Sequence, residues 1–490
     1  MATITKHKGR RFPKEANDHY RYKMGDNTPS ELLLDNIKDL QDMVQNHMAY
    51  QRPRLEELDD YYLGDNTTIL HDRERHQAED HKADYRATHN YAKYVSQFIV
   101  GYLAGNPITV QHEDESTEEV ISQINRLNDT DALNSDLVLD LSIYGRAYEL
   151  LYRNRRDENR IAVSSPLNTF VIYDDTVEQL PIAAVRYHKN EMLESDPFKV
   201  DVYTDSEIIR YQSESNAVIV LYEVEREPHF FGGVPINEYA NNRFRQGDFE
   251  NVLNLIDLYD AAQSDTANYM TDLNDAMLKI TGNLEMSRED ASDMKQSNIL
   301  FLKTEPDADG RQGNADADYI YKEYDVQGSE AYKGRLQTDI HKFTNTPDMQ
   351  DENFSGHQSG ESLKYKLFGL DQVRAIKERL FRRSLTNRYR LLGNILNVSA
   401  ELSGGNMDGL TIQFTPNLPR SLTDEVSMFS DLGGQLSEET MLAMLSIVED
   451  PQAEIDRLNA ERTGQMNPNR DYISNRQGGE GEGEENAGQS

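Results

Sequence analysis

Apolar residues recur at helical spacing through the first part of the chain. The pattern predicts a helix that begins near Ser30, breaks at Pro53 and ends at Gly64, because serine caps helix starts and glycine ends them. A second, more buried helix is predicted over 91–105, and the turn "GNPITV" leads from it into a strand. Further amphipathic spacing predicts helices over 116–128 and 131–153.

The pattern then changes to short runs rich in aromatic and β-branched residues. Between 161 and 227 these runs alternate with turn residues, which predicts several β-strands: "IAVSSPLNTFVIYDD", "PIAAVRYHK", "FKVDVYTDSEIIRYQ" and "AVIVLYEVE". Helical spacing returns over 249–277. We therefore predict an α+β fold that is mainly helical.

The last third combines helices with polar segments. Residues 279–326 read as a small α/β insertion with an acidic loop, and a helix follows from 327. A polar, glycine-broken loop over 346–360 leads into a long helix over 361–402 and then the strand "GLTIQFTPNLP". Shorter helices are predicted to about 459, and the tail "NRQGGEGEGEENAGQS" has the composition of disordered chain.

Composition narrows the class of protein. The 490 residues suffice for several cores, yet only 37% are hydrophobic and 28% are charged, as in an elongated or self-associating chain. The net charge of −35 argues against an ordinary sequence-specific DNA-binding protein, because such proteins neutralise phosphates with basic residues. There is no cysteine, which excludes disulfides and thiolate sites. Lacking a signal-like start or a long apolar run, the chain is expected to be soluble, intracellular and not in a membrane.

The helix predicted over 249–277 carries an acidic stripe opposite its apolar side. The acidic residues fall within an arc of roughly 140° and have almost no basic neighbours on the helix. They are Glu250, Asp257, Asp260, Asp265, Asp272 and Asp275. Such a stripe is either a solvated face or, if copies of the helix surround an axis, an electronegative wall.

The sequence shows no recognisable catalytic or metal-binding motif. His71, His76 and His81 are five residues apart, whereas zinc on a helix requires spacing of four. The acidic loop "DADGRQGNADAD" lacks the glycine and glutamate of a calcium loop. Asp174 and Asp175 close a strand and read as turn residues. We predict a binding and structural protein, not an enzyme, with no metal and no cofactor.

The long helix over 361–402 is the most basic part of the chain. Its basic residues are Arg374, Lys377, Arg379, Arg382, Arg383, Arg388 and Arg390. In so acidic a chain we favour pairing with acidic faces of neighbouring helices or subunits over direct contact with DNA. The helix is too long for one compact domain and reads as an element between subunits.

Several stretches resemble the portal (head–tail connector) proteins of tailed bacteriophages, of the type common in siphophages of Gram-positive hosts. They are "FIVGYLAGNPITV", "IYGRAYELLY", "SPLNTFVIYDD", "GGVPINEYANNRFRQGDFENVLNLIDLYDAAQS" and "TPDMQDENFSGHQSGESLKYKLFGLDQ". The resemblance implies a ring of about twelve copies around a channel through which double-stranded DNA is packaged and ejected. It also implies as partners the terminase large subunit, a head-completion or adaptor protein, and the major capsid and scaffolding proteins. The location implied is the portal vertex of the virion, with host cytoplasm during assembly.

The resemblance also divides the chain into regions. They are a flexible N-terminal arm (1–29), a wing of helices and β-strands (30–248), a stem helix (249–278), a clip that docks the motor (279–326), a second stem helix (327–345), a tunnel loop (346–360), a long helix and strand of tunnel wall and wing (361–419), a crown (420–475) and a disordered acidic tail (476–490). The acidic stripe would then line the channel and centre the sliding duplex.

The tunnel loop would touch DNA without basic residues, so its contacts would be weak and short-lived. The loop residues expected in the channel are Asp348, Asp351, Glu352, Asn353, Phe354, Ser355, Gly356, His357, Gln358 and Ser359. Lys364 and Lys366 would lie nearest the channel behind it. Two other classes stay open: a metal-dependent nuclease or phosphotransferase using Asp174 and Asp175, and an acidic oligomeric scaffold unrelated to DNA.

Overall fold

The structure is a computed structural model that carries the protein chain alone. It describes residues 10–23, 36–71, 84–190, 192–193, 195–217, 220–272, 277–281, 316–320, 325–349, 367–399, 402, 407, 409–417, 429–430, 436–443, 445, 448 and 454–459. The chain divides into two compact units, one of residues 1–355 with 366–417 and the other of residues 356–365 with 418–490.

The first unit begins with a near-continuous helical run. Its parts are α2 (Ile37–Asn46), the π-helical turn η2 (His47–Gln51) and α3 (Arg52–Leu63). Pro53 lies in the first turn of α3, where its missing N–H costs little, and the π-helical turn stands directly before it. Gly64 ends α3 with φ of +94°, a left-handed conformation that glycine adopts without strain. The predicted end at Gly64 is confirmed, whereas the predicted break at Pro53 is wrong, because the run stays helical through the π-helical turn directly before it.

Four further helices follow in the first unit. They are α4 (Thr67–His71), α5 (Tyr91–Ala104), α6 (Glu115–Asn128) and α7 (Thr130–Tyr144). The side chain of Asn90 caps α5 by accepting the N–H of Lys93 at 3.0 Å, and that of Asp114 caps α6 by accepting the N–H of Thr117 at 2.9 Å.

One predicted helix is too long. The helix expected over 131–153 ends at Tyr144, and the strand β3 (Arg146–Arg153) follows at once. Gly145 has φ of +79°, and a Cβ added there would lie 2.2 Å from the carbonyl oxygen of Arg245. Only glycine fits this junction, so the apolar run "AYELLY" continues as a buried strand.

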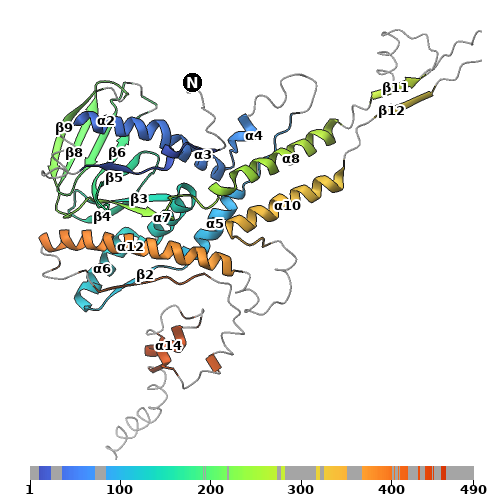
Figure 1. Ribbon diagram of the computed structural model, residues 1–490. Helices are drawn as coiled ribbons and strands as arrows, with labels where there is room; N and C mark the ends of the chain where they lie inside the picture. Colours follow the sequence, from blue (N-terminus) through green and yellow to red (C-terminus); the bar gives the residue numbers. More distant parts are fainter. Residues whose placement is uncertain are drawn as a thin grey trace, which may run out of the picture. The chain divides into compact units, whose positions relative to one another are not determined.

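A six-stranded sheet has the order β1-β5-β6-β7-β8-β9 and is antiparallel except for the parallel pair β1 and β5. Its strands are β1 (Tyr20–Tyr22), β5 (Thr169–Asp174), β6 (Pro181–His188), β7 (Lys199–Tyr203), β8 (Glu207–Ser213) and β9 (Leu221–Pro228). Leu40 and Val44 of α2 pack on this sheet against Phe170 and Val185, and Figure 1 shows α2 lying across it. The β-strands predicted between 161 and 227 are confirmed.

A second core joins two small sheets to the longest helix. The three-stranded sheet has the order β10-β3-β4, with β4 (Asn159–Ser164) and β10 (Ile236–Ala240). The pair of β2 (Thr109–His112) and β13 (Leu410–Gln413) is antiparallel. Leucines of α7 and residues of α12 (Phe368–Val398) are buried together in this core, which we call the central core.

The remaining elements of the first unit are two helices and a hairpin. The short 3-10 turn η3 (Glu250–Val252) leads into α8 (Leu253–Asp272), and α10 (Val326–Thr344) follows later. Between them, β11 (Met277–Thr281) pairs antiparallel with β12 (Asp316–Ile320). In the second unit, the structure describes α14 (Glu438–Ala443) and a helical stretch over 454–459. The α+β fold class is confirmed.

Candidate functional site

The helices α8 and α10 lie side by side and run in opposite directions (Figure 1). Near one end of the pair, the side-chain amide of Asn251 donates to the carbonyl of Phe343 at 3.1 Å. Farther along, Lys333 donates to the side chain of Gln263 at 3.0 Å. Because residue numbers rise on one helix as they fall on the other, the hairpin of β11 and β12 extends from the far end of the pair.

An extended segment, residues 84–90, runs along α8. The backbone N–H groups of Tyr85, Ala87 and His89 donate to side chains of α8, at 2.6, 2.9 and 2.9 Å. The acceptors, in the same order, are Asn268, Ser264 and Asp260. Steps of four residues on a helix cover about 6 Å, and steps of two residues on an extended chain cover about 6.6 Å. The two spacings match, so the segment is held along the helix as a strap.

This strap corrects the predicted acidic stripe at Asp260. Its side chain is fully buried and accepts hydrogen bonds from the N–H and the ring of His89, each at 2.9 Å, and from the amide of Asn66. It therefore faces the interior of its own chain and not a channel.

Two further members of the stripe are also paired inside the chain. Glu250 forms an ion pair with Arg54 at 2.6 Å, with the two side chains 8% and 1% exposed. Asp257 pairs with Arg11 at 2.6 Å and accepts a hydrogen bond from Tyr61. For Glu250, Asp257 and Asp260, the prediction of a shared exposed face is wrong, because basic and polar groups from the first ninety residues cover that side of the helix.

The ion pair at Asp257 also corrects part of the predicted flexible arm. Arg11 is held by Glu57 as well, at 2.6 Å, and burial lowers while Glu57 and Asp257 raise the pKa of its guanidinium, with a net rise above its ordinary value. Downstream, β1 pairs with β5. Residues 10–23 are therefore packed within the first unit, and the expectation of flexibility is wrong for them.

The other predicted site residues divide into two groups. Asp265 is exposed on α8. Outside the described side chains lie Asp272, Asp275, Asp351, Glu352, Asn353, Phe354, Ser355, Gly356, His357, Gln358, Ser359, Lys364 and Lys366. Asp348 is described, at the point where the predicted tunnel loop leaves α10.

The start of that loop is anchored on α5. The hydroxyl of Tyr94 donates to the carbonyl of Pro347 at 2.8 Å. The side chain of Gln337 donates to Asp348 at 2.9 Å. Asp348 lies 4.0 Å from the ring of His341, and burial lowers the pKa of that ring while Asp348 opposes the shift. Sequence reasoning missed Tyr94, because an aromatic residue on a buried helix carries no signal of which distant loop it contacts.

The basic helix α12 is partly a core element. Arg388 pairs with Glu149 at 2.6 Å, and both side chains are fully buried. Burial lowers the pKa of the Arg388 guanidinium, but Glu149, Tyr239 and Tyr389 together raise it above the ordinary value. Lys377 pairs with Asp248 at 2.7 Å, and burial lowers its pKa. Pairing with acidic groups, the favoured interpretation, is confirmed for these two residues within one chain.

Candidate catalytic groups have structural roles instead. One oxygen of Asp174 accepts hydrogen bonds from the N–H of Thr176 at 3.1 Å, its hydroxyl at 2.7 Å and the N–H of Leu180 at 3.2 Å, which closes the turn after β5. Among the described residues, no group of three His, Asp or Glu side chains is placed to hold a metal ion. In the same part of the chain, no helix combines the length and apolar character needed to cross a membrane.

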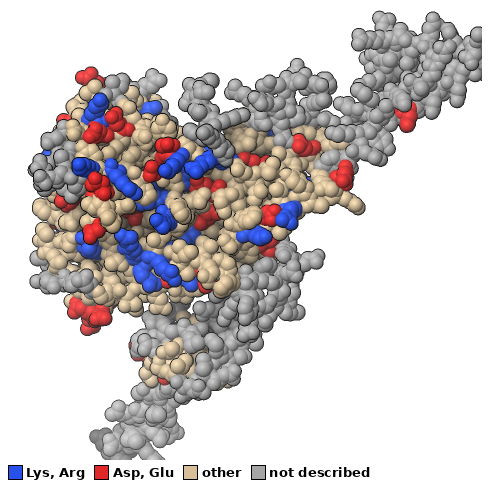
Figure 2. Space-filling model, viewed as in Figure 1, with Lys and Arg blue, Asp and Glu red and all other residues tan. Residues whose placement is uncertain are grey.

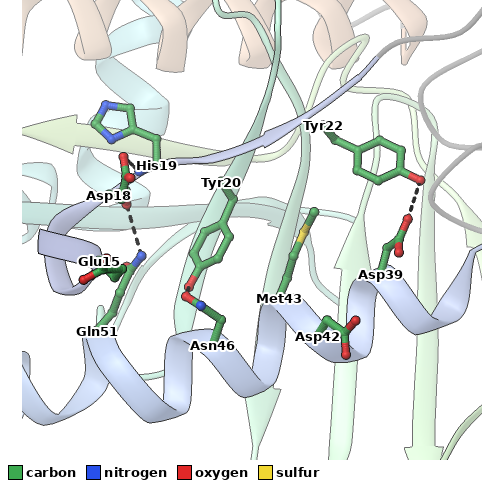
Figure 3. Close-up of a pocket in the computed structure, with 10 residues that line it drawn as sticks. All are labelled: Glu15, Asp18, His19, Tyr20, Tyr22, Asp39, Asp42, Met43, Asn46 and Gln51. Atoms are coloured by element: carbon green, nitrogen blue, oxygen red, sulfur yellow. Dashed lines mark hydrogen bonds between the residues drawn. The ribbon is translucent and has the colours of Figure 1, made fainter.

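A cavity of about 390 Å³ lies between the segment around β1 and α2 (Figure 3). It is lined by Glu15, Asp18, His19, Tyr20, Tyr22, Asp39, Asp42, Met43, Asn46 and Gln51. Tyr22 donates to Asp39 at 2.9 Å, and Gln51 donates to the carbonyl of Asp18 at 3.0 Å. These bonds join the N-terminal segment to the first helical run.

In the described part of the chain, buried charged groups pair with one another, and the antiparallel pair of α8 and α10 leads to the hairpin of β11 and β12 at one end and to the start of a loop at the other. The family model described as "Phage portal protein, SPP1 Gp6-like" matches residues 41–467. The chain therefore belongs to this family of phage portal proteins, and the predicted resemblance is confirmed.

Individual relatives agree with the family. The portal protein of Bacillus phage SPP1 is 22% identical over 398 residues, which cover 78% of this chain and 77% of that protein. The portal protein of Clostridium phage phiCD119 is 23% identical over 339 residues, covering 65% of this chain and 73% of that protein. A chain of the solved neck of an empty GTA particle is similar with a TM-score of 0.41 and 11% identity, covering 72% of this chain and 90% of that one.

Proposed function

We propose that this protein is the portal of a phage head, a ring of about twelve copies around a channel through which double-stranded DNA enters and leaves. The match of the portal family model over residues 41–467 carries the proposal. The antiparallel pair of α8 and α10, with a hairpin at one end and a loop start at the other, fits a channel wall with two functional ends.

In this proposal the regions take the following places: wing 30–248, stem 249–278 and 327–345, clip 279–326, tunnel loop 346–360, tunnel wall and wing 361–419, crown 420–475 and acidic tail 476–490. The clip would dock the terminase large subunit and later the head-completion or adaptor protein. The wing and crown would meet the major capsid and scaffolding proteins. The ring would act without catalysis of its own, in the virion and, during assembly, in the host cytoplasm.

The acidic residues that we propose for the channel wall are Asp265, which is exposed on α8, and Asp272 and Asp275. Twelve copies would carry a formal charge of about −420, so the duplex would be repelled from every side and would slide without strong phosphate contacts. Tyr94 would hold the base of the tunnel loop while residues 351–359 meet the DNA.

Negative-stain images and mass photometry of the purified protein, also in the presence of its capsid and scaffolding proteins, test the proposal. The expected result is rings of about twelve or thirteen subunits with a hole wide enough for a duplex. A compact dimer or tetramer without a channel under all these conditions would overturn it.

A further inference from the structure

The outer face of α12 carries three arginines that we call the arginine stripe: Arg379, Arg383 and Arg390. At 100° per residue they fall within an arc of roughly 40°. That arc lies opposite Phe381 and Leu385, which are buried in the central core. All three are exposed, and Figure 2 shows Lys and Arg side chains gathered over α12.

Among the described residues, the arginine stripe forms no ion pair, unlike the other basic residues of the helix, and Arg390 instead donates to the side-chain oxygen of Asn387 at 2.8 Å. Arg374 and Arg382 pair with Glu378 at 2.5 and 2.8 Å, and Lys377 and Arg388 are buried in ion pairs. Across the described parts of the chain, no acidic side chain forms a salt bridge with the arginine stripe, although the chain has 86 acidic residues and 51 Lys and Arg. A cationic surface about 16 Å long is therefore left without a carboxylate partner among the described residues.

A complementary set lies at the start of α7 and along it. We call Asp129, Asp136 and Asp140 the aspartate stripe. In the portion of the chain that the structure describes, none of the three forms a salt bridge. Asp136 and Asp140 are one turn apart, where like charges repel. Burial, then Asp136 and Asp59, raise the pKa of Asp140 to about 7. This surface thus lacks positive charge.

The two stripes cannot meet within one copy. Leu137 of α7 and Leu385 of α12 are both buried in the central core. The arginine stripe is exposed on the opposite side of α12, and on the aspartate stripe Asp129 and Asp136 are exposed while Asp140 is half-buried. The arginines lie roughly 150–190° from the core side of α12, and the aspartates roughly 85–125° from the core side of α7. Complementary surfaces on different sides of one chain are what a head-to-tail ring contact requires.

The spacing of the charges also matches. Read backwards, the arginine stripe has intervals of seven and then four residues, from 390 to 383 to 379. The aspartate stripe has the same intervals read forwards, from 129 to 136 to 140. Two antiparallel helices would therefore place three opposite charges in register.

We propose that α12 of one copy lies antiparallel against α7 of the next copy in the ring, with Arg390 facing Asp129, Arg383 facing Asp136 and Arg379 facing Asp140. The inference rests on the proposed function, because it names the contact that closes the portal ring. Each copy uses its arginine stripe on one side and its aspartate stripe on the other.

A charge-swap experiment tests the contact. Arg379→Glu with Arg383→Glu reverses one surface, and Asp136→Arg with Asp140→Arg reverses the other. Each pair should lower the fraction of protein in rings about tenfold or more at low salt, and the fourfold variant should restore it. Arg155→Glu with Arg156→Glu is the matched control, because both arginines are exposed between β3 and β4 and the change of charge is the same. Its ring fraction should stay at the wild-type level.

Covalent trapping tests the register. The chain has no cysteine, so Arg383→Cys with Asp136→Cys in one chain introduces the only thiols. Oxidation of assembled rings should give a ladder of covalent oligomers, whereas Arg155→Cys with Asp136→Cys should not. If the wild-type protein forms rings but the Arg383→Cys, Asp136→Cys variant gives no covalent ladder, the proposed contact is wrong and the portal function stands. The same holds if the fourfold charge-swap variant does not restore ring formation. Failure of the wild-type protein to form rings would overturn both.

Discussion

The backbone N–H of His89 donates to the buried carboxylate of Asp260 at 2.9 Å, which fixes the end of an extended segment on the helix α8. The same carboxylate also receives the imidazole of His89 and the amide of Asn66. A charged acceptor shared by several donors is stronger than a neutral one. The acid at this position is thus explained by the segment that it binds, rather than by a channel.

Replacing Asp260 with Asn should loosen this segment. The amide would present a donor to groups that donate, and the loss should be about 1–3 kcal/mol. Hydrogen exchange at the His89 amide should become faster and the melting temperature should fall. Asp265→Asn on the exposed side of α8 is the control and should change stability by less than about 0.5 kcal/mol. Equal effects of the two substitutions would contradict the buried role of Asp260.

Replacing Tyr94 with Phe should free the start of the tunnel loop. The change removes the hydroxyl that donates to Pro347 and keeps the ring, at a cost of about 0.5–1.5 kcal/mol. DNA packaged per particle should fall although rings still form. Tyr102→Phe, on the same helix with a 3.3 Å contact to Asp371, serves as the control and should package normally. Full packaging by the Tyr94 variant would show that the anchor does not control the loop.

Much of the fold could be predicted from local signals. Gly64 ends a helix as expected, and the aromatic and β-branched runs between 161 and 227 are strands. The prediction that the helix continues past Gly145 is wrong for a specific reason. An apolar run that follows a helix has the pattern of further helix unless the glycine between them is recognised as the end of the helix. Only the closely approaching carbonyl of Arg245, a hundred residues away, shows why glycine is required there.

The periodicity of the sequence could not show whether water or another segment covers the acidic stripe. A helix face covered by an extended polar segment has the same pattern as one covered by water, because both need polar side chains. One signal was present in α8: Ser264 and Asn268 continue the line of Asp260, and such small polar residues bind backbone better than they solvate a surface. The contacting segment has no periodicity of its own, so its partner emerges only in three dimensions.

Removing the buried partner of Glu149 should be among the most damaging single changes. Arg388→Met leaves a buried carboxylate without its cation, which costs about 3–5 kcal/mol. Arg388→Met with Glu149→Gln should cost less than the sum of the two single changes, and a double-mutant cycle on the melting curves measures the difference. Arg379→Met, exposed on the same helix, is the control and should leave the melting temperature of the monomer unchanged. Strict additivity would refute the coupling.

Asp140 should make the single chain less stable as the pH rises. Burial, then Asp136 and Asp59, raise the pKa of Asp140 to about 7, above the value of about 3.9 expected in the unfolded chain. The folded state therefore holds the proton more tightly, so stability is lost as the pH rises from about 4 to about 7.

The groups around Asp140 make the expected effect of a substitution specific. Tyr144 donates to Asp59 at 2.9 Å beside Asp140. Among the described residues that shift the pKa of Asp140, none is basic. Asp140→Asn removes the repulsion, so the monomeric variant should melt higher than wild type at pH 8 and equally at pH 4. Asp131→Asn, exposed on the same helix, should show no such pH dependence. In rings, Asp140→Asn should instead melt lower than wild type at pH 8, because the proposed contact with Arg379 requires the negative charge of Asp140. If the substitution raised the melting temperature of rings as well as of monomers at pH 8, that contact would be contradicted.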